Sequence, residues 1–175
     1  MEVLQWAREN GCPWDSFTCG HAAHNGHMEI LQWARENGCP WCELTTALAA
    51  ANGHFEVLRW ARENGCPWNS FAFSFAAASF RWEWLEWLRE KGCPWDERAC
   101  SIAAKRGSLD VLKWFRANGC PWDEWTCSAA AGSGHLEVLK WARENGCPWD
   151  KSLALEKAKH NQHQEVEKRI LENDT

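Results

Sequence analysis

The feature that most constrains this chain is the tetrapeptide Gly-Cys-Pro-Trp, which occurs six times. Successive copies are 27 residues apart, and their tryptophans are Trp14, Trp41, Trp68, Trp95, Trp122 and Trp149. A fixed period of this length is typical of repeat proteins, in which each unit packs only against its neighbours. The 175 residues therefore predict a stack of repeats instead of a domain built around one central core.

Each repeat carries the signals of two helices. In five of the six copies an Asp or Asn, such as Asp15, follows the tryptophan and can cap a starting helix. The first helix is rich in alanine and ends at a turn such as Asn25-Gly26, and the second helix ends at a turn such as Asn37-Gly38. The pattern predicts an all-α solenoid of about six helix pairs that follow one N-terminal helix.

We divide the chain as a single repeat domain over residues 1–175. Residues 1–11 form a partial repeat, and residues 147–175 form a polar C-terminal capping repeat in which Arg169 replaces the helix tryptophan. The five full repeats cover residues 12–38, 39–65, 66–92, 93–119 and 120–146. Because residues 1–11 have no polar cap, we expect the N-terminal end face to be covered by another chain or by a missing repeat.

Residues 130–146 read Ala-Ala-Gly-Ser-Gly-His-Leu-Glu-Val-Leu-Lys-Trp-Ala-Arg-Glu-Asn-Gly and closely resemble the second half of the ankyrin repeat. Residues 22–38 and 49–65 show the same pattern. The Thr-Pro-Leu-His opening of that family is absent, and the period is 27 residues instead of 33. The family's β-hairpin finger is therefore expected to have shrunk to the Cys-Pro-Trp-Asp turn. The resemblance implies a non-catalytic protein-binding module that uses its concave surface, without a cofactor.

Charge and hydropathy exclude several classes of partner. The net charge is -5 and the pI is about 5.8, whereas nucleic acids and anionic membranes call for a basic surface. No apolar run approaches the roughly 18 residues of a membrane span, and no signal peptide is visible. We expect a protein partner, in the cytoplasm or another reducing compartment.

Ten cysteines would suggest disulfides in a small secreted protein. The six loop cysteines, however, recur once per repeat, at a helix-packing distance of roughly 8–10 Å, which exceeds the roughly 7 Å between Cα atoms that a disulfide tolerates. We interpret them as small buried residues in a reducing compartment. Cys39 and Cys42 have the C-x-x-C spacing of dithiol oxidoreductases and half-zinc sites. Because Cys42 merely replaces the capping residue in one of six copies, a redox or metal role remains the distant alternative.

An arginine in the last turn of each second helix could suggest a phosphate track. These residues are Arg8, Arg35, Arg62, Arg89, Arg116 and Arg143, and a glutamate follows in five of the six copies. Because the glutamates cancel the positive field, we expect solvated arginines that stack on the loop tryptophans.

Two positions of the first helix vary from repeat to repeat, whereas its alanine positions are constant. The residues at each of these two positions form a row across the repeats. One row is Phe17, Leu44, Phe71, Arg98 and Trp125; the other is His21, Leu48, Phe75, Ile102 and Ala129. A variable row on a rigid repeat is where binding specificity can reside, and exposed apolar residues in a line mark an interface. We predict a partner-binding set of Phe17, His21, Leu44, Phe71, Phe75, Phe80, Arg98 and Trp125.

The fourth repeat departs most from the pattern, because Phe80 stands where other repeats place the turn glycine. Its aromatic residues could equally be extra core packing, and we expect Trp82 and Trp84 to be oversized core residues. The sequence thus favours a non-catalytic module that binds a protein along the first-helix surface. The alternative is a structural or scaffolding subunit of a large assembly, docked through its N-terminal end.

Overall fold

The computed structural model describes residues 1–79 and 81–172, and these residues form thirteen helices joined by turns. One helix is followed by six helix pairs, which confirms the predicted all-α repeat solenoid. The helices fall into two compact units, Met1–Pro94 and Trp95–Thr175. Within the described residues, no helix has both the length and the apolar character to cross a bilayer.

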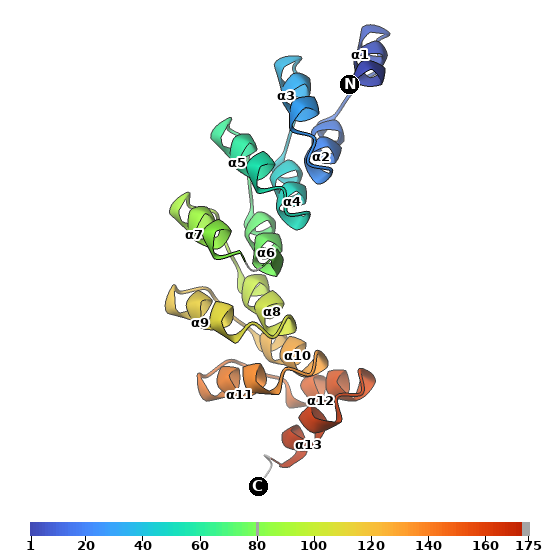
Figure 1. Cartoon of the computed structure of the whole chain (residues 1–175). Coiled ribbons are helices and arrows are strands. Elements are labelled where there is room, and N and C mark those ends of the chain that lie inside the picture. The colour runs from blue at the N-terminus through green and yellow to red at the C-terminus, as the bar shows by residue number, and fades with distance from the viewer. Residues whose placement is uncertain (80, 173–175) are drawn as a thin grey trace. The chain divides into compact units, whose positions relative to one another are not determined.

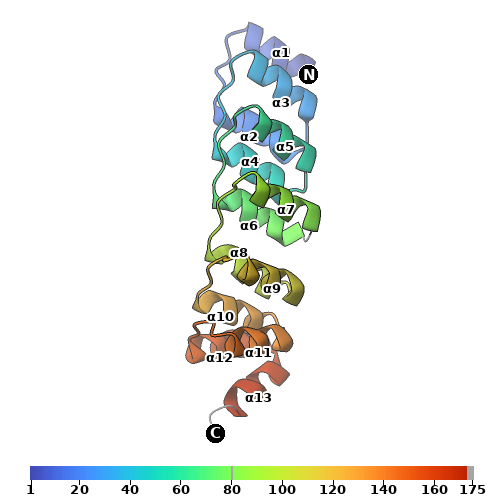
Figure 2. The same ribbon diagram turned by 90° about the vertical axis from the view of Figure 1, so that its left-hand side faces the viewer.

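The first unit contains two rows of helices (Figures 1 and 2). The first helices of its repeats, α2, α4 and α6, pack directly on one another, and α3, α5 and α7 form the second row beside them. The bounds are α1 (Glu2–Glu9), α2 (Ser16–His24), α3 (Met28–Glu36), α4 (Glu43–Ala51), α5 (Phe55–Glu63), α6 (Ser70–Ser79) and α7 (Trp82–Glu90).

The second unit repeats this arrangement. Its first helices α8, α10 and α12 pack on one another, and each contacts the second helix of its own repeat. The bounds are α8 (Glu97–Lys105), α9 (Leu109–Ala117), α10 (Glu124–Gly132), α11 (Leu136–Glu144), α12 (Lys151–His160) and α13 (Gln164–Glu172).

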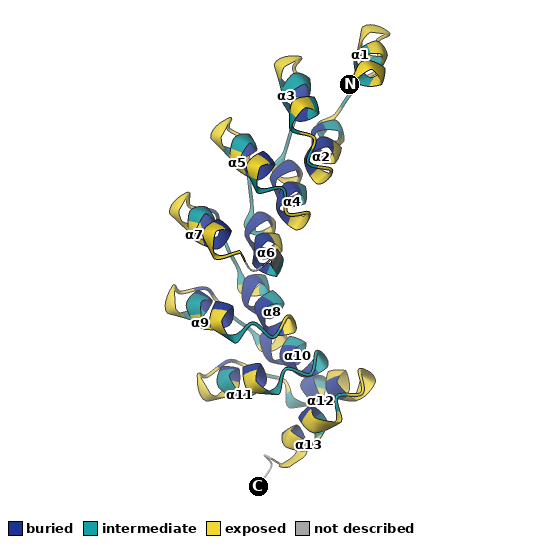
Figure 3. Ribbon diagram, viewed as in Figure 1, coloured by how far each residue is buried: buried dark blue, intermediate teal, exposed yellow. Residues whose placement is uncertain are grey.

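Small buried residues explain why the first helices pack so closely. Each first helix contributes alanines to the core where it meets its neighbours, and Figure 3 shows these sides of the helices as buried. The alanines include Ala22, Ala23, Ala49, Ala50, Ala76, Ala77, Ala103, Ala104, Ala130 and Ala131. The second helices contribute larger buried residues, such as Leu31, Leu58, Leu85 and Leu112.

The predicted capping residues start the first helices. The side chain of Asp15 accepts a hydrogen bond from the backbone N–H of Phe17 at 2.9 Å, and Asn69, Asp96 and Asp123 make the equivalent bond. Asp150 caps α12 through Leu153. Cys42 makes no such bond, so α4 begins without a side-chain cap.

A histidine of the next repeat covers the turn glycine of several repeats. Gly26 has φ +69°, and a Cβ atom placed on it would lie 2.6 Å from the imidazole of His54. The same holds for Gly107 under His135, at 2.6 Å, and for Gly134 under His163, at 2.7 Å. Glycine is therefore required at these turns both by its left-handed backbone and by the ring above it.

The tryptophans and arginines join each loop to the helices around it. The loop tryptophan and the helix tryptophan of the same repeat meet edge to face, as in Trp41 with Trp60, at centroid distances of 5.7 to 6.1 Å. The arginine that ends the second helix lies over the following loop tryptophan, as Arg62 lies 4.5 Å from Trp68. Equivalent stacks form at Arg8, Arg35, Arg116 and Arg143, which confirms the expected arginine–tryptophan packing.

The loop cysteines do more than fill space. Five of the six are buried, and only Cys12 is exposed. Each buried thiol donates a hydrogen bond to the carbonyl of the capping residue one repeat earlier, at sulfur–oxygen distances of 3.4 to 3.8 Å. The pairs are Cys39 with Asp15, Cys66 with Cys42, Cys93 with Asn69, Cys120 with Asp96 and Cys147 with Asp123. The thiols thus tie neighbouring loops together.

One expectation for the fourth repeat is wrong. Trp84 is buried and stacks on Phe55 with the ring centroids 4.9 Å apart, as expected for a core residue, but Trp82 is 41% exposed. Trp82 shares its row with Met28, Phe55 and Leu109, which are all only half-buried. That row lies at the rim of the core, so an indole placed there extends into solvent.

Candidate partner-binding surface

The first turn of each first helix presents one variable side chain. In the first unit these are Phe17, Leu44 and Phe71, and they are 56%, 37% and 42% exposed. The backbone N–H groups of Phe17 and Phe71 are the ones that bond to the capping side chains Asp15 and Asn69. The cap therefore fixes the turn from which these side chains project. Because α2, α4 and α6 pack side by side, the three apolar groups form one row on the exposed side of the first helices.

A second row lies one helical turn further on. Phe75 is 36% exposed and stacks on Phe71 of the same helix, with the ring centroids 5.8 Å apart and the rings inclined by 21°. His21 occupies the same row on α2 and is exposed. Phe73, between the two stacked rings in sequence, is fully buried. The core of the fourth repeat is thus made by Phe73 and Trp84, while Phe71 and Phe75 lie on the surface.

Phe80, the remaining aromatic residue predicted for this set, lies outside the described residues. The structure brings together Phe17, Leu44, Phe71 and Phe75 with His21 on the first helices of the first unit. The other two predicted residues, Arg98 and Trp125, belong to the second unit.

In the second unit the same rows carry different chemistry. Arg98 on α8 is half-buried and forms an ion pair with the capping residue Asp96, whose carboxylate raises the pKa of the guanidinium. The Arg98 Nε lies 3.1 and 3.0 Å from the two carboxylate oxygens. Trp125 on α10 is 53% exposed, and its indole is the largest apolar group on this side of the unit.

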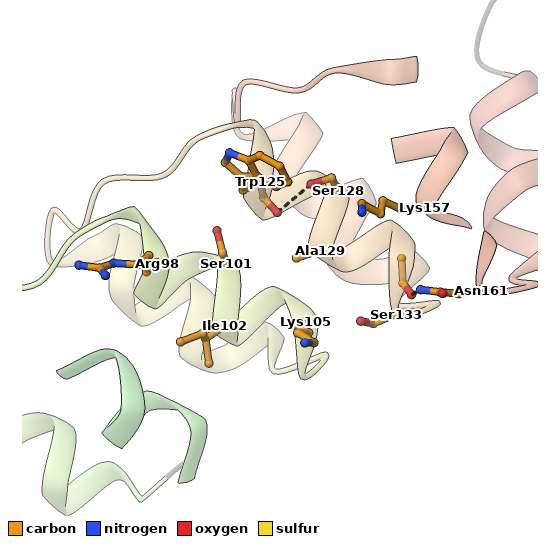
Figure 4. A pocket seen from close by; sticks show the side chains of 11 residues that line it. Arg98, Ser101, Ile102, Lys105, Trp125, Ser128, Ala129, Ser133, Lys157 and Asn161 are labelled. Atoms are coloured by element: carbon orange, nitrogen blue, oxygen red, sulfur yellow. Dashed lines mark hydrogen bonds between the residues drawn. The ribbon is translucent and has the colours of Figure 1, made fainter. Parts of the chain in front are cut away.

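A groove runs beside Trp125 across α8, α10 and α12 (Figure 4). It has a volume of about 450 Å³. Its lining residues are Arg98, Ser101, Ile102, Lys105, Trp125, Ser128, Ala129, Gly132, Ser133, Lys157 and Asn161. Of these, the predicted partner-binding set contained Arg98 and Trp125, and the second variable row contained Ile102 and Ala129. The sequence analysis did not recognise that Ala129 and Gly132 on α10 are small enough to leave a depression between Lys105 and Lys157.

The described residues hold no arrangement that indicates a metal site or a reactive dithiol. They contain no group of three His, Cys, Asp or Glu side chains placed to hold a metal ion. In the C-x-x-C segment, the buried Cys39 thiol is bonded to the Asp15 carbonyl at 3.4 Å, as in the other repeats, and Cys42 is half-buried at the cap position. Burial raises the pKa of the thiols of Cys66 and Cys93 to about 12, which makes them unreactive at neutral pH.

Comparison with known proteins agrees with this architecture. No protein-family model matches the chain, and no curated protein sequence is similar to it. Among solved structures, the chain is similar to the ankyrin repeat domain of human ASB11, with 16% sequence identity and a TM-score of 0.62. The match covers 90% of this chain and 83% of that one. The chain thus has an ankyrin-like repeat fold, built from helix pairs with a Gly-Cys-Pro-Trp turn.

Proposed function

We propose that the protein is a non-catalytic interaction module that binds a protein partner along the exposed side of its first helices. The observation that carries the proposal is the stacked pair Phe71 and Phe75, which lies exposed in line with Leu44 and Phe17. Apolar side chains that stay exposed to water forgo the stabilisation of burial, which is roughly 25 cal/mol per Å² of apolar area. Covering them with a partner would recover that free energy. A line of exposed apolar groups on a rigid support is typical of an interaction surface.

The contrast between constant and variable positions supports the same surface. The tryptophans, arginines and cysteines that join the repeats recur at fixed positions, whereas the exposed rows change from Phe to Leu, Arg and Trp. The recurring tryptophans, arginines and cysteines stabilise the stack of repeats. The residues in the variable rows can therefore change without destabilising it. Aromatic side chains and arginine are also the residues that most often dominate binding energies at interfaces.

The test is an affinity pull-down from the source cell with the double variant Phe71→Ser/Phe75→Ser. Both side chains lie on the surface, so the variant should keep the far-UV circular dichroism of the wild type. We expect it to lose the partner that the wild-type chain retains, as identified by mass spectrometry. The matched control is Trp82→Ser, which removes an aromatic group of similar exposure from the second helix α7 and should retain the partner.

Two outcomes would contradict the proposal. Unfolding of the double variant would assign Phe71 and Phe75 to the core. Recovery of the same multiprotein complex with both variants would favour the alternative, a structural subunit that is held by another part of the chain.

A further inference from the structure

The groove of the second unit combines positive charge with an exposed indole. Arg98, Lys105 and Lys157 line it, and none of its eleven lining residues is acidic. The chain as a whole has a net charge of -5, so this groove is a local exception to its surroundings. A concave site lined by one sign of charge concentrates ligands of the opposite sign.

Two of the three cations are available to a ligand. Arg98 is already neutralised by Asp96. Neither Lys105 nor Lys157 forms an ion pair with a described residue, and both side chains are exposed. Figure 4 shows that they come from α8 and α12, with the Ala129 side of α10 between them.

Small residues form the floor of the groove, and an apolar side chain lies at one end of it. Ala129 and Gly132 on α10 stand where α8 has Ile102 and Lys105, so the middle helix is lower than its neighbour. A Cβ atom on Gly132 would lie 3.1 Å from the Cβ of Lys157, which shows that the lysine stem packs on the bare glycine backbone. At the other end of α10, the Trp125 indole lies exposed beside the groove (Figure 4).

We propose that this groove takes an acidic segment of a protein partner. One apolar side chain of the segment lies against the Trp125 indole, and its carboxylates bind the ammonium groups of Lys105 and Lys157. The inference rests on the proposed function and names the chemistry that one part of the surface recognises.

The dimensions favour a peptide. The groove crosses three packed helices, a span of about 16–20 Å at the usual helix spacing, and an extended chain covers that span with about five or six residues. A phosphate group would favour an arginine free to bind two of its oxygens, but the Arg98 guanidinium is held by Asp96.

The probe is a phage-displayed library of random eight-residue peptides, selected on the purified, immobilised full-length chain. The pool bound by the wild type should contain Asp and Glu at about twice their frequency in the unselected library, next to an apolar residue. The charge-reversing double variant Lys105→Glu/Lys157→Glu should instead enrich Lys and Arg. Both lysines are exposed, so this variant should keep the circular dichroism of the wild type.

The control is Lys113→Glu/Lys168→Glu, which changes the net charge equally but on the second helices α9 and α13. It should keep the acidic enrichment. A selected acidic peptide should bind the wild type at least about tenfold more tightly than its Asn and Gln counterpart, as measured by fluorescence anisotropy.

The groove inference is overturned if the wild-type pool shows no acidic enrichment, or if the two double variants change the pool equally. Its failure can be distinguished from failure of the proposed function. A partner that is lost with Phe71→Ser/Phe75→Ser but retained by Lys105→Glu/Lys157→Glu would leave the interaction module standing and remove only the acidic segment.

Discussion

At the residue scale, the arginine that ends each second helix joins that helix to the loop after it. The Arg62 guanidinium lies over the Trp68 ring, and its Nη1 donates a hydrogen bond to the Cys66 carbonyl at 3.3 Å. A cation over an indole contributes about 0.5–2 kcal/mol, depending on how far it is withdrawn from water.

We therefore expect Arg62→Ala to lower the free energy of unfolding by about 1–2 kcal/mol in urea titrations. The matched control is Arg59→Ala on the same helix, where Arg59 forms an exposed ion pair with Glu56. Its loss should cost less than about 0.5 kcal/mol. Equal losses for the two variants would contradict a specific role for the arginine–tryptophan stack.

Because of the buried thiols, the free energy of unfolding should decrease as the pH rises into the alkaline range. Burial raises the pKa of the Cys66 thiol from 9.0 to about 12, so above pH 9 the unfolded chain loses this proton while the folded chain keeps it. The contribution is complete below pH 9 and is lost as the pH rises toward 12, by about 1.4 kcal/mol per pH unit.

Urea titrations between pH 9 and 10.5 should therefore show a shallower decline of the free energy of unfolding for Cys66→Ala than for the wild type. The control is the same pair of proteins below pH 8, where the Cys66 thiol keeps its proton in both states and the two slopes should coincide. A Cys66→Ala slope equal to that of the wild type would show that the thiol does not titrate as proposed.

The sequence predicted that all six loop cysteines are buried, which is correct for five of them and wrong for the exposed Cys12, and it did not predict their hydrogen bonds. Each bond joins a thiol to a carbonyl 24 residues earlier, so it depends on how one repeat is placed against the next. Every residue has a backbone carbonyl, so the residue types do not reveal which carbonyl accepts the bond. The arginine–tryptophan contact was predictable because its partners lie only six residues apart.

At the element scale, the turn between the two helices of a repeat is shaped by the repeat that follows. The backbone of Gly26 is left-handed, and the His54 ring occupies the space of a side chain. Gly65, at the turn after α5, has φ +86° but no atom within 4 Å of a Cβ position. Comparing substitutions at the two glycines therefore separates the cost of a left-handed backbone from the cost of a clash with the His54 ring.

Gly65→Ala should cost about 1–2 kcal/mol, the penalty of the left-handed conformation alone. Gly26→Ala should cost at least about 1 kcal/mol more, because the His54 ring must move as well. In urea unfolding, His54→Ala added to Gly26→Ala should recover part of this excess. If Gly26→Ala costs no more than Gly65→Ala, the ring does not constrain the turn.

The helices themselves were largely predictable from the period. A capping Asp or Asn follows the loop tryptophan in five of the six copies, and a glycine stop such as Asn37-Gly38 recurs every 27 residues. Both signals are local, so they place most of the helix pairs. Burial in the fourth repeat was less predictable. Trp82 and Trp84 look alike in sequence, but only the Trp84 row faces the core, a distinction that depends on the packing of α7 on its neighbours.

At the scale of the whole molecule, the variable residues divide into two chemistries. The first unit presents Phe17, Leu44, Phe71 and Phe75, and the second presents Arg98 and Trp125 beside a basic groove. Comparing repeats was enough to find the variable positions, of which Phe17, Phe71 and Trp125 are among the exposed ones. The groove was missed because its depth comes from Ala129 and Gly132 lying between longer side chains of neighbouring repeats, which requires three helices to be placed together.

The most direct test of the central claim is photo-crosslinking from the two sides of one repeat. p-Benzoylphenylalanine replaces Phe71 on the first helix α6 in one protein and Trp82 on the second helix α7 in another. Each protein is irradiated in an extract of the source cell, and the crosslinked products are identified by mass spectrometry. If the partner binds the first helices, position 71 should crosslink to one partner protein and position 82 should not. Crosslinking from position 82 alone would contradict this account and would place the interaction surface on the second helices.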